Sequence, residues 1–107
     1  MGARAIDPAD HAGRRPLDRG SAESIAQTLR ALADPTRLQL LSLIASAPDG
    51  QVTIGVLADA LGLRQPTVTH HIRILVADGV VQREPVGRQV WISLSPDRRD
   101  DILDLLR

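Results

Sequence analysis

The side chains best suited to chemistry in this 107-residue chain lie between positions 64 and 88. They are guanidinium, amide, hydroxyl and imidazole groups, which donate and accept hydrogen bonds. Arg pairs bidentately with guanine or phosphate, Gln pairs with adenine, and a Thr methyl group contacts the methyl group of thymine. The set therefore predicts recognition of duplex DNA by Arg64, Gln65, Pro66, Thr67, Thr69, His70, Arg73, Arg83 and Arg88.

Most of this set lies at the start of one predicted helix. Gly62 ends a preceding helix, and the next runs from about Gln65 to Asp78, with Gly79 ending it. At about 100° per residue, the apolar side of this helix and its polar side are opposite each other. The apolar side, expected in the core, is Val68, Ile72, Leu75 and Val76; the polar side is Pro66, Thr67, His70 and Arg73.

A glycine turn between two such helices is typical of a helix-turn-helix, in which the second helix enters the DNA major groove. Gln65 and Thr69 lie near the start of that helix, the end that approaches the base edges. His71 lies at the edge of the apolar side, so we interpret it as a packing residue.

Two segments with β-strand character follow this helix. Residues 80–84 and 88–94 are separated by Pro85-Val86-Gly87, which predicts a hairpin with Gly87 in its turn. Arg83 and Arg88 would flank that turn and follow the minor groove or the DNA backbone.

The remaining elements are predicted to be helices. Ser21, Asp34 and Thr53 are suitable N-caps for three helices that precede the glycine turn, and Ser95-Pro96 opens a last one. The order is α-α-α-α-β-β-α, so the fold class is mainly α with a small β-hairpin, a winged helix-turn-helix. With one aromatic residue, Trp91, the core must be built from Leu, Ile, Val and Ala.

The chain divides into two parts by composition. Residues 1–20 are rich in Pro, Gly and charge, which predicts a flexible tail, and residues 21–107 form one DNA-binding and dimerisation domain. Arg14, Arg15 and Arg19 offer an alternative role for the tail, contact with the DNA backbone.

The first and last helices carry more apolar side chains than a monomer this small leaves exposed. They predict a homodimer interface formed by Ile25, Leu29, Ile102, Leu103 and Leu106.

Charge and composition limit the function classes. The formal net charge is 0, so DNA binding requires a local basic face, and residues 64–93 carry four Arg against Asp78 and Glu84. There is no Cys, no apolar stretch near the roughly 20 residues of a membrane span, and no apolar signal-peptide segment, which predicts a cytoplasmic protein with no membrane partner. The sequence has no Gly-rich phosphate loop and no nucleophile with a plausible base, so nothing in it suggests an enzyme.

Several segments resemble the ArsR/SmtB family of bacterial transcription regulators. They are residues 29–38 (LRALADPTRL), 57–75 (LADALGLRQPTVTHHIRIL), 78–81 (DGVV) and 87–94 (GRQVWISL). The resemblance implies a homodimer that binds a palindromic operator, usually as a repressor, and releases it when an effector binds. Arg64 departs from the family, which has Ser or Thr there as N-cap; Arg cannot cap but can contact phosphate.

The metal sites that the resemblance implies are missing their ligands. One family site uses two Cys, at positions that correspond to Thr53 and Gly55, and another begins with Asp and His near Pro96 and Arg98. His70 and His71 point about 100° apart on one helix and cannot easily chelate one ion. We therefore expect no metal and no cofactor in the folded domain.

The tail holds the third histidine, His11, beside Asp7 and Asp10, a weak candidate for a metal ligand. Two functional alternatives stay open. The chain is a DNA-binding subunit whose sensing comes from a separate protein, or its winged helix binds a protein instead of DNA.

Overall fold

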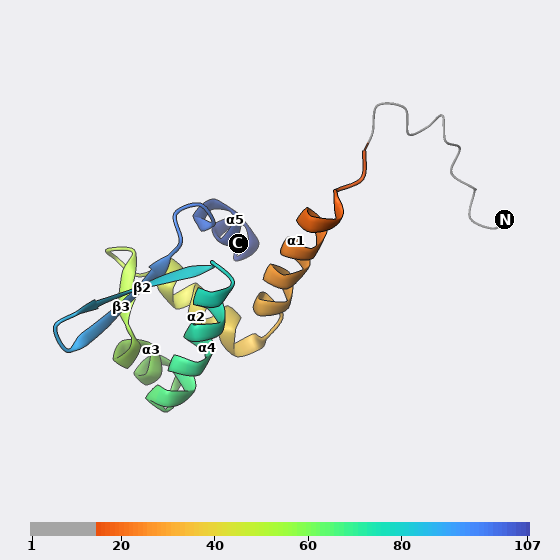
Figure 1. Ribbon diagram of the computed structural model, residues 1–107. Coiled ribbons are helices and arrows are strands. Elements are labelled where there is room, and N and C mark those ends of the chain that lie inside the picture. The colour runs from red at the N-terminus through yellow and green to blue at the C-terminus, as the bar shows by residue number, and fades with distance from the viewer. Residues whose placement is uncertain (1–14) are drawn as a thin grey trace.

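The computed structural model describes residues 15–107, and Figure 1 shows their arrangement. The predictions for residues 1–14, including those for Arg14 and His11, lie outside the described residues. The elements along the chain are α1 (Arg19–Leu32), α2 (Pro35–Ala45), β1 (Gln51–Thr53), α3 (Ile54–Leu61), α4 (Gln65–Ala77), β2 (Val81–Val86), β3 (Gln89–Leu94) and α5 (Arg99–Leu105). The predicted winged helix-turn-helix is confirmed, with one strand, β1, in addition.

The first helix starts earlier than predicted, because Asp18 and not Ser21 is its N-cap. The Asp18 carboxylate accepts hydrogen bonds from the Ser21 amide at 2.8 Å and from the Ser21 hydroxyl at 2.7 Å. The backbone N–H of Ser21 is the main reason that the pKa of Asp18 is lowered. Arg19 and Gly20, assigned to the tail from the sequence, therefore belong to α1.

The helix-turn-helix has the capping that the sequence predicts. The Thr53 hydroxyl accepts from the Val56 amide at the start of α3, and Gly62 ends that helix in the left-handed region, at a φ of 64°. A side chain with a Cβ is strained in that conformation, so glycine allows the short turn into α4. No side chain caps α4, because the residue before it is Arg64.

The sheet has three strands in the order β1-β3-β2, all antiparallel. β1 was not predicted, because three residues are too few for alternation to be visible. The wing is longer than predicted: β2 continues through Pro85 to Val86, and Gly87 and Arg88 form the two-residue turn. Pro85 is tolerated because β2 is an edge strand, where a missing N–H leaves no hydrogen bond unmade inside the sheet.

The last helix starts later than predicted. Ser95 is buried and its amide donates to the carbonyl of Val80, the residue directly before β2. Pro96 therefore lies in a turn, and α5 begins only at Arg99.

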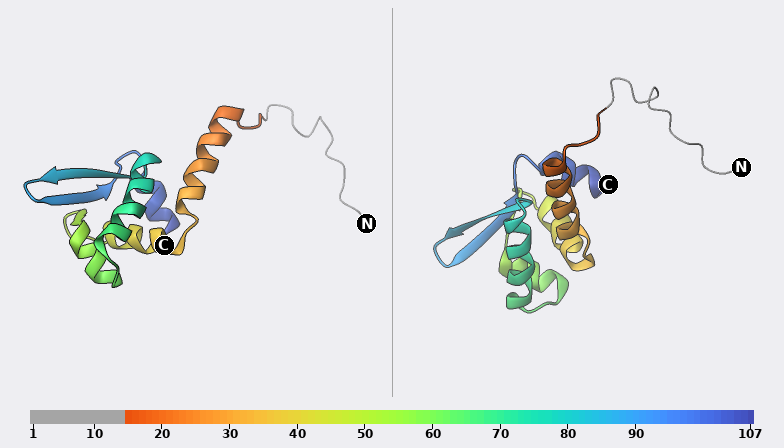
Figure 2. Two further views of the ribbon diagram at one scale, coloured as in Figure 1. Left: turned by 60° about the horizontal axis from the view of Figure 1, so that its bottom comes forward. Right: turned by 45° about the vertical axis from the view of Figure 1, so that its right-hand side comes forward.

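The core is aliphatic and lies between α2, α3, α4 and the sheet. It consists of Leu32, Leu40, Leu41, Ile44, Leu57, Ala58, Val68, Ile72, Leu75, Val80, Val81, Ile92, Leu94 and Ile102. α1 contributes only its last turn to this core, and the rest of the helix projects from the body on the side away from the wing (Figures 1 and 2). Within the described part of the chain, no helix is long and apolar enough to cross a membrane.

Asp34 is the N-cap of α2, as predicted, and its carboxylate accepts from the Arg37 amide at 3.0 Å. That hydrogen bond is the main reason that the pKa of Asp34 is lowered, and the Arg37 guanidinium, 3.9 Å away, lowers it further. A carboxylate with a lowered pKa stabilises the fold above its ordinary pKa, and this contribution is lost as the pH falls through the folded-state value.

We expect Asp34→Ala to lower the free energy of unfolding by about 1 kcal/mol at pH 7, the usual effect of removing an N-cap. In urea denaturation at pH 7 and at pH 3, the difference from the wild type should shrink at the lower pH. Asp34→Asn, which keeps a cap acceptor that does not titrate, is the matched control and should lose less at pH 7. An equal loss in both variants at both pH values would contradict the capping role.

Candidate nucleic-acid interface

The two sides of α4 have opposite environments, as the helical wheel predicts. Val68, Ile72 and Leu75 are buried, and Val76 packs against the core. The predicted DNA-contacting residues on α4 and before it are exposed, except Thr69, which is half-buried; the exposed ones are Arg64, Gln65, Pro66, Thr67, His70 and Arg73. The apolar side thus holds the helix in place while the polar side stays accessible.

A cleft of about 430 Å³ lies between α4 and the wing. Its lining combines the start of α3, one side of α4 and both wing strands: Thr53, Ile54, Gly55, Gln65, Thr69, Ile72, Arg73, Arg83, Arg88, Gln89 and Val90. Five residues predicted from the sequence therefore come together here, although up to 23 positions separate them along the chain. Arg64, Pro66, Thr67 and His70 are exposed outside this lining.

The sheet register explains why Arg83 reaches the cleft. Arg83 pairs with Ile92, so its side chain lies on the same face of the wing as that core residue and Val90. The prediction that Arg83 flanks the turn was wrong, because β2 continues for three residues beyond it; only Arg88 lies in the turn. Arg83 lies in mid-strand and faces α4.

The charged residues that line the cleft are all basic. Its lining includes three arginines and no carboxylate. In residues 15–107, Arg73, Arg83 and Arg88 make no ion pair. Three guanidinium groups without a protein anion beside them favour binding of a polyanion in this cleft.

Sequence reasoning missed two polar residues of the cleft. The sequence predicts a capping role for Thr53 and a strand position for Gln89, and both residues also line the cleft. The position of Gln89 directly after Arg88 at the hairpin tip is the signal that would have found it. Gly55 also lines the cleft, and a Cβ there would make ordinary van der Waals contact with Gln65 Nε2, at 3.6 Å.

His71 is half-buried and belongs to a polar network. Its Nδ1 lies 3.3 Å from a terminal guanidinium nitrogen of Arg37, at the start of α2. The neighbouring His70 is exposed, and its ring centroid lies 5.6 Å from that of His71.

None of the residues at the four positions where the resemblance implies metal ligands is a Cys, His, Asp or Glu. Thr53 uses its hydroxyl as an N-cap and Gly55 has no side chain. Pro96 and Arg98 offer no ligand, and among the described residues no group of three His, Cys, Asp or Glu side chains is placed to hold an ion.

The predicted dimer residues fall into two groups. Ile25 and Leu29 on α1 are 45% and 56% exposed. Ile102 is in the core, and Leu103 and Leu106 pack against it, so these three stabilise the single chain. The exposed apolar residue of α5 is instead Leu105.

This fold and this site define a winged helix-turn-helix transcription regulator that binds DNA, and comparison with known proteins agrees. A family model described as a helix-turn-helix domain matches residues 32–84. The HTH-type transcriptional regulator NmtR of Mycobacterium tuberculosis is 36% identical over 89 residues, which cover 83% of this chain and 72% of that protein.

Two further relatives support the assignment. The HTH-type transcriptional repressor SmtB of Mycobacterium tuberculosis is 36% identical over 80 residues, covering 75% of this chain and 57% of that protein. The solution structure of a homodimeric winged helix-turn-helix DNA-binding domain, Mb0332 from Mycobacterium bovis, superposes with a TM-score of 0.68 at 26% identity, over 86% of this chain and 82% of that one. The chain belongs to the ArsR/SmtB family of transcription regulators, which are not enzymes.

Proposed function

We propose that this protein is a homodimeric, sequence-specific repressor that binds a palindromic operator. The observation that carries the proposal is the cleft between α4 and the wing, where three unpaired arginines meet two glutamines and two threonines. A helix in the major groove supplies base contacts, and a hairpin beside it contacts the flanking backbone.

The position of each side chain suggests its role. Gln65 and Thr67, at the exposed start of α4, reach base edges, and Arg73, about two turns further along the helix, reads guanine. Arg83 and Arg88 bind phosphate from the wing. Thr69 supports Gln65 inside the cleft, while Arg64, Pro66 and His70 contact the backbone beside the groove.

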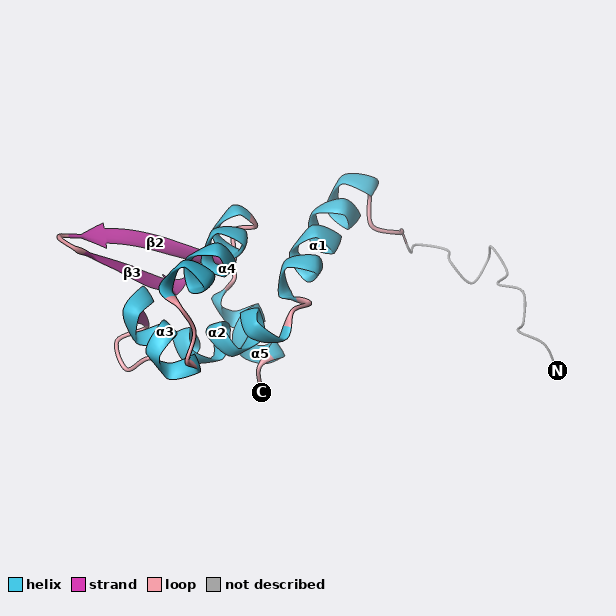
Figure 3. Ribbon diagram, turned by 90° about the horizontal axis from the view of Figure 1, so that it is seen from below, coloured by secondary structure: helices cyan, strands magenta, loops and turns pink. Residues whose placement is uncertain are grey.

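The homodimer is proposed through α1 and α5, which lie on the side of the body away from the wing tip (Figures 1 and 3). Leu17, Ile25 and Leu29 form an apolar row on and before α1, and Leu105 adds to it from α5. These side chains are between 45% and 65% exposed, an unusual amount for large aliphatic residues of so small a domain. A two-fold axis through this surface would leave both α4 helices free for half-sites.

The repressor role follows the family and the name of the similar SmtB protein. The missing Cys and His ligands suggest that the effector is not a metal held by the folded domain, so a separate sensor protein or a small molecule would release the DNA. A regulator of this kind acts in the cytoplasm, where the DNA is. If the winged helix binds a protein instead, selection from a random duplex pool will return no preferred sequence.

Arg73→Ala should weaken binding to the selected operator by about 1–3 kcal/mol and relax the preference for one base pair. Arg88→Ala should weaken binding to all duplexes alike and reduce the salt dependence by about one phosphate contact. Fluorescence anisotropy across a salt series distinguishes the two roles. Arg99→Ala, an exposed arginine at the start of α5, is the control and should change neither. A uniform loss for Arg73→Ala would assign that residue to the backbone.

Leu29→Glu should shift the protein from dimer to monomer at tens of micromolar, because a charge in an apolar interface costs on the order of 2 kcal/mol or more. Sedimentation equilibrium measures the change. Val56→Glu is the matched control: Val56 is 55% exposed, much like Leu29, but lies on α3, outside the proposed interface. A dimer that survives Leu29→Glu and dissociates with Val56→Glu would place the interface elsewhere.

Calorimetric titration of the metal-free dimer with Zn²⁺ or Ni²⁺ should show no sub-micromolar site in the folded domain, since thiolates are absent and its two imidazoles diverge. The full chain should be compared with a variant that lacks residues 1–14, which keeps α1 whole. Stoichiometric, tight binding that persists in the shorter variant and releases DNA would overturn the expectation.

A further inference from the structure

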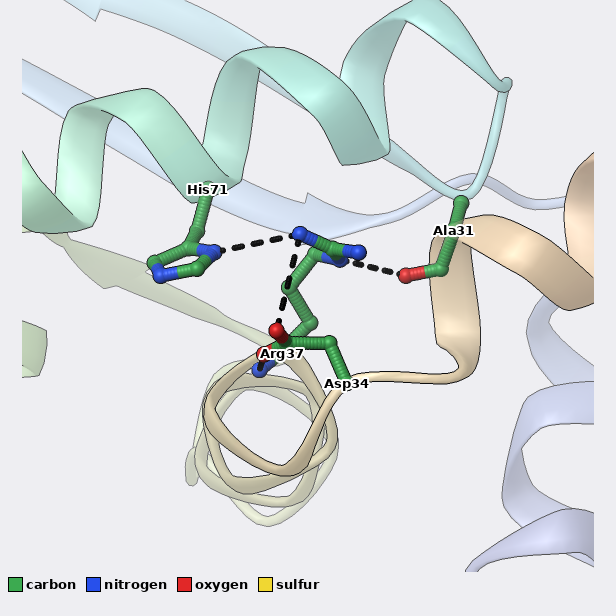
Figure 4. A network of polar contacts seen from close by, with 4 residues as sticks. All are labelled: Ala31, Asp34, Arg37 and His71. Atoms are coloured by element: carbon green, nitrogen blue, oxygen red, sulfur yellow. Dashed lines mark hydrogen bonds and ion pairs between the residues drawn. The ribbon is translucent and has the colours of Figure 1, made fainter.

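One guanidinium group connects three helices of this protein. Arg37, in the first turn of α2, donates from Nε to the Ala31 carbonyl in the last turn of α1. A terminal nitrogen, Nη1, lies 3.3 Å from His71 Nδ1 on α4 and 3.9 Å from the Asp34 carboxylate that caps α2 (Figure 4). The helix proposed for dimerisation and the helix proposed to read DNA thus meet at Arg37.

One of these contacts satisfies a backbone group that α1 leaves without an intrahelical partner. The last four carbonyls of an α-helix lack such a partner, and the Ala31 carbonyl is one of them, in a residue only 3% exposed. The Arg37 side chain is itself only 14% exposed, so its hydrogen bonds are largely shielded from water. A shielded, charge-assisted bond holds its partners more firmly than an exposed pair does.

The contact with His71 requires one protonation state. Guanidinium has donors and no acceptor, so the hydrogen bond exists only when His71 Nδ1 carries a lone pair and the ring proton is on Nε2. A proton added at Nδ1 removes the acceptor and places two cations in contact.

We infer that Arg37 is a positioning residue for DNA binding: through neutral His71 it sets the orientation of α4 relative to α1, and protonation of His71 releases that orientation. The inference rests on the proposed function. In a dimer formed through α1, the angle between α1 and α4 decides the distance between the two reading helices. That distance must match the half-site spacing of the operator.

The charged groups around His71 are consistent with this effect. On α2 they are Arg37 and Asp34, and α1 contributes only the Ala31 carbonyl, through Arg37. Asp59 of α3 and Arg83 and Glu84 of β2 make no hydrogen bond to His71 within the described part of the chain. The Asp34 carboxylate is also close enough for a positive charge on His71 to lower the pKa of Asp34, so an imidazolium would compete with the Arg37 guanidinium for that carboxylate.

The adjacent His70 supplies an internal contrast. It is exposed on the side of α4 proposed to face DNA, so a proton on His70 adds a cation near phosphate and favours binding as the pH falls. A proton on His71 has the opposite effect on operator binding.

The test measures the affinity of the full chain for a selected operator between pH 8 and pH 5.5 at constant ionic strength. Wild type should lose about tenfold more affinity over this range than His71→Gln, whose side-chain carbonyl still accepts from Arg37 but does not titrate. At pH 8, His71→Gln should bind within about threefold of wild type, and His71→Ala about tenfold more weakly. His70→Gln, the matched control, should show a steeper loss at low pH than wild type.

A second readout separates positioning from general stability. His71→Ala should also discriminate less between operators whose half-sites are moved apart by one base pair, while its affinity for random duplex DNA stays within about threefold of wild type. Equal pH dependence in wild type and His71→Gln, or unchanged spacing discrimination in His71→Ala, would overturn the inference and leave DNA binding intact. If wild type selects no DNA at all, the proposed function fails and the inference fails with it.

Discussion

The structure depends on the burial of one face of α4. Val68 and Leu75 are fully buried and Ile72 is almost so, and they contact residues from α2, α3 and the sheet. Each such side chain stabilises the fold by about 1.5–3 kcal/mol when it leaves water. Because this side of the helix is buried in the core, its polar side must face outward. The turn at Gly62 and the position of the wing then place α3 and the wing strands beside that polar side.

The wing converts that exposed helix into a concave surface. β3 is the central strand, paired with β1 beside α3 and with β2 at the edge, so the hairpin can extend beyond the core. Its extension carries Arg83 and Arg88 to the side of the cleft opposite Arg73. A chain with no net charge thereby presents three cations on one face, while four aspartates lie in the segment around α5. Local placement, and not total charge, makes the surface suited to a polyanion.

The connection between α1 and the rest of the domain also depends on few residues. α1 reaches the core only through its last turn, and Arg37 ties that turn to α2 and α4. A helix held at one end transmits its direction through few contacts, so the groups at that junction have a large effect on where a second subunit would place its own reading helix.

The sequence by itself determined the local elements. Helix-ending glycines, N-cap residues and a 3.6-residue hydrophobic period are short-range signals. Neighbouring residues were therefore enough to predict the two helices around Gly62, the buried side of α4 and the hairpin. The resemblance to the family could also be recognised from the sequence alone, because its motifs are contiguous. Arg73 could be chosen because helical geometry puts it on the polar side of α4, and Gln65 and Thr69 because they lie near the start of that helix.

Only the tertiary structure decided which distant groups meet. β1 exists because its three residues pair with β3, and Pro85 stays in a strand because β2 lies at an edge. The Ser95 amide donates a hydrogen bond to the Val80 carbonyl, and α5 starts four residues later, at Arg99. This start places Ile102 in the core and leaves Leu105 exposed. Arg37 and His71 are 34 positions apart, and no periodicity links them. Their contact depends on how α2 and α4 pack, which is set by the whole core and not by any local pattern.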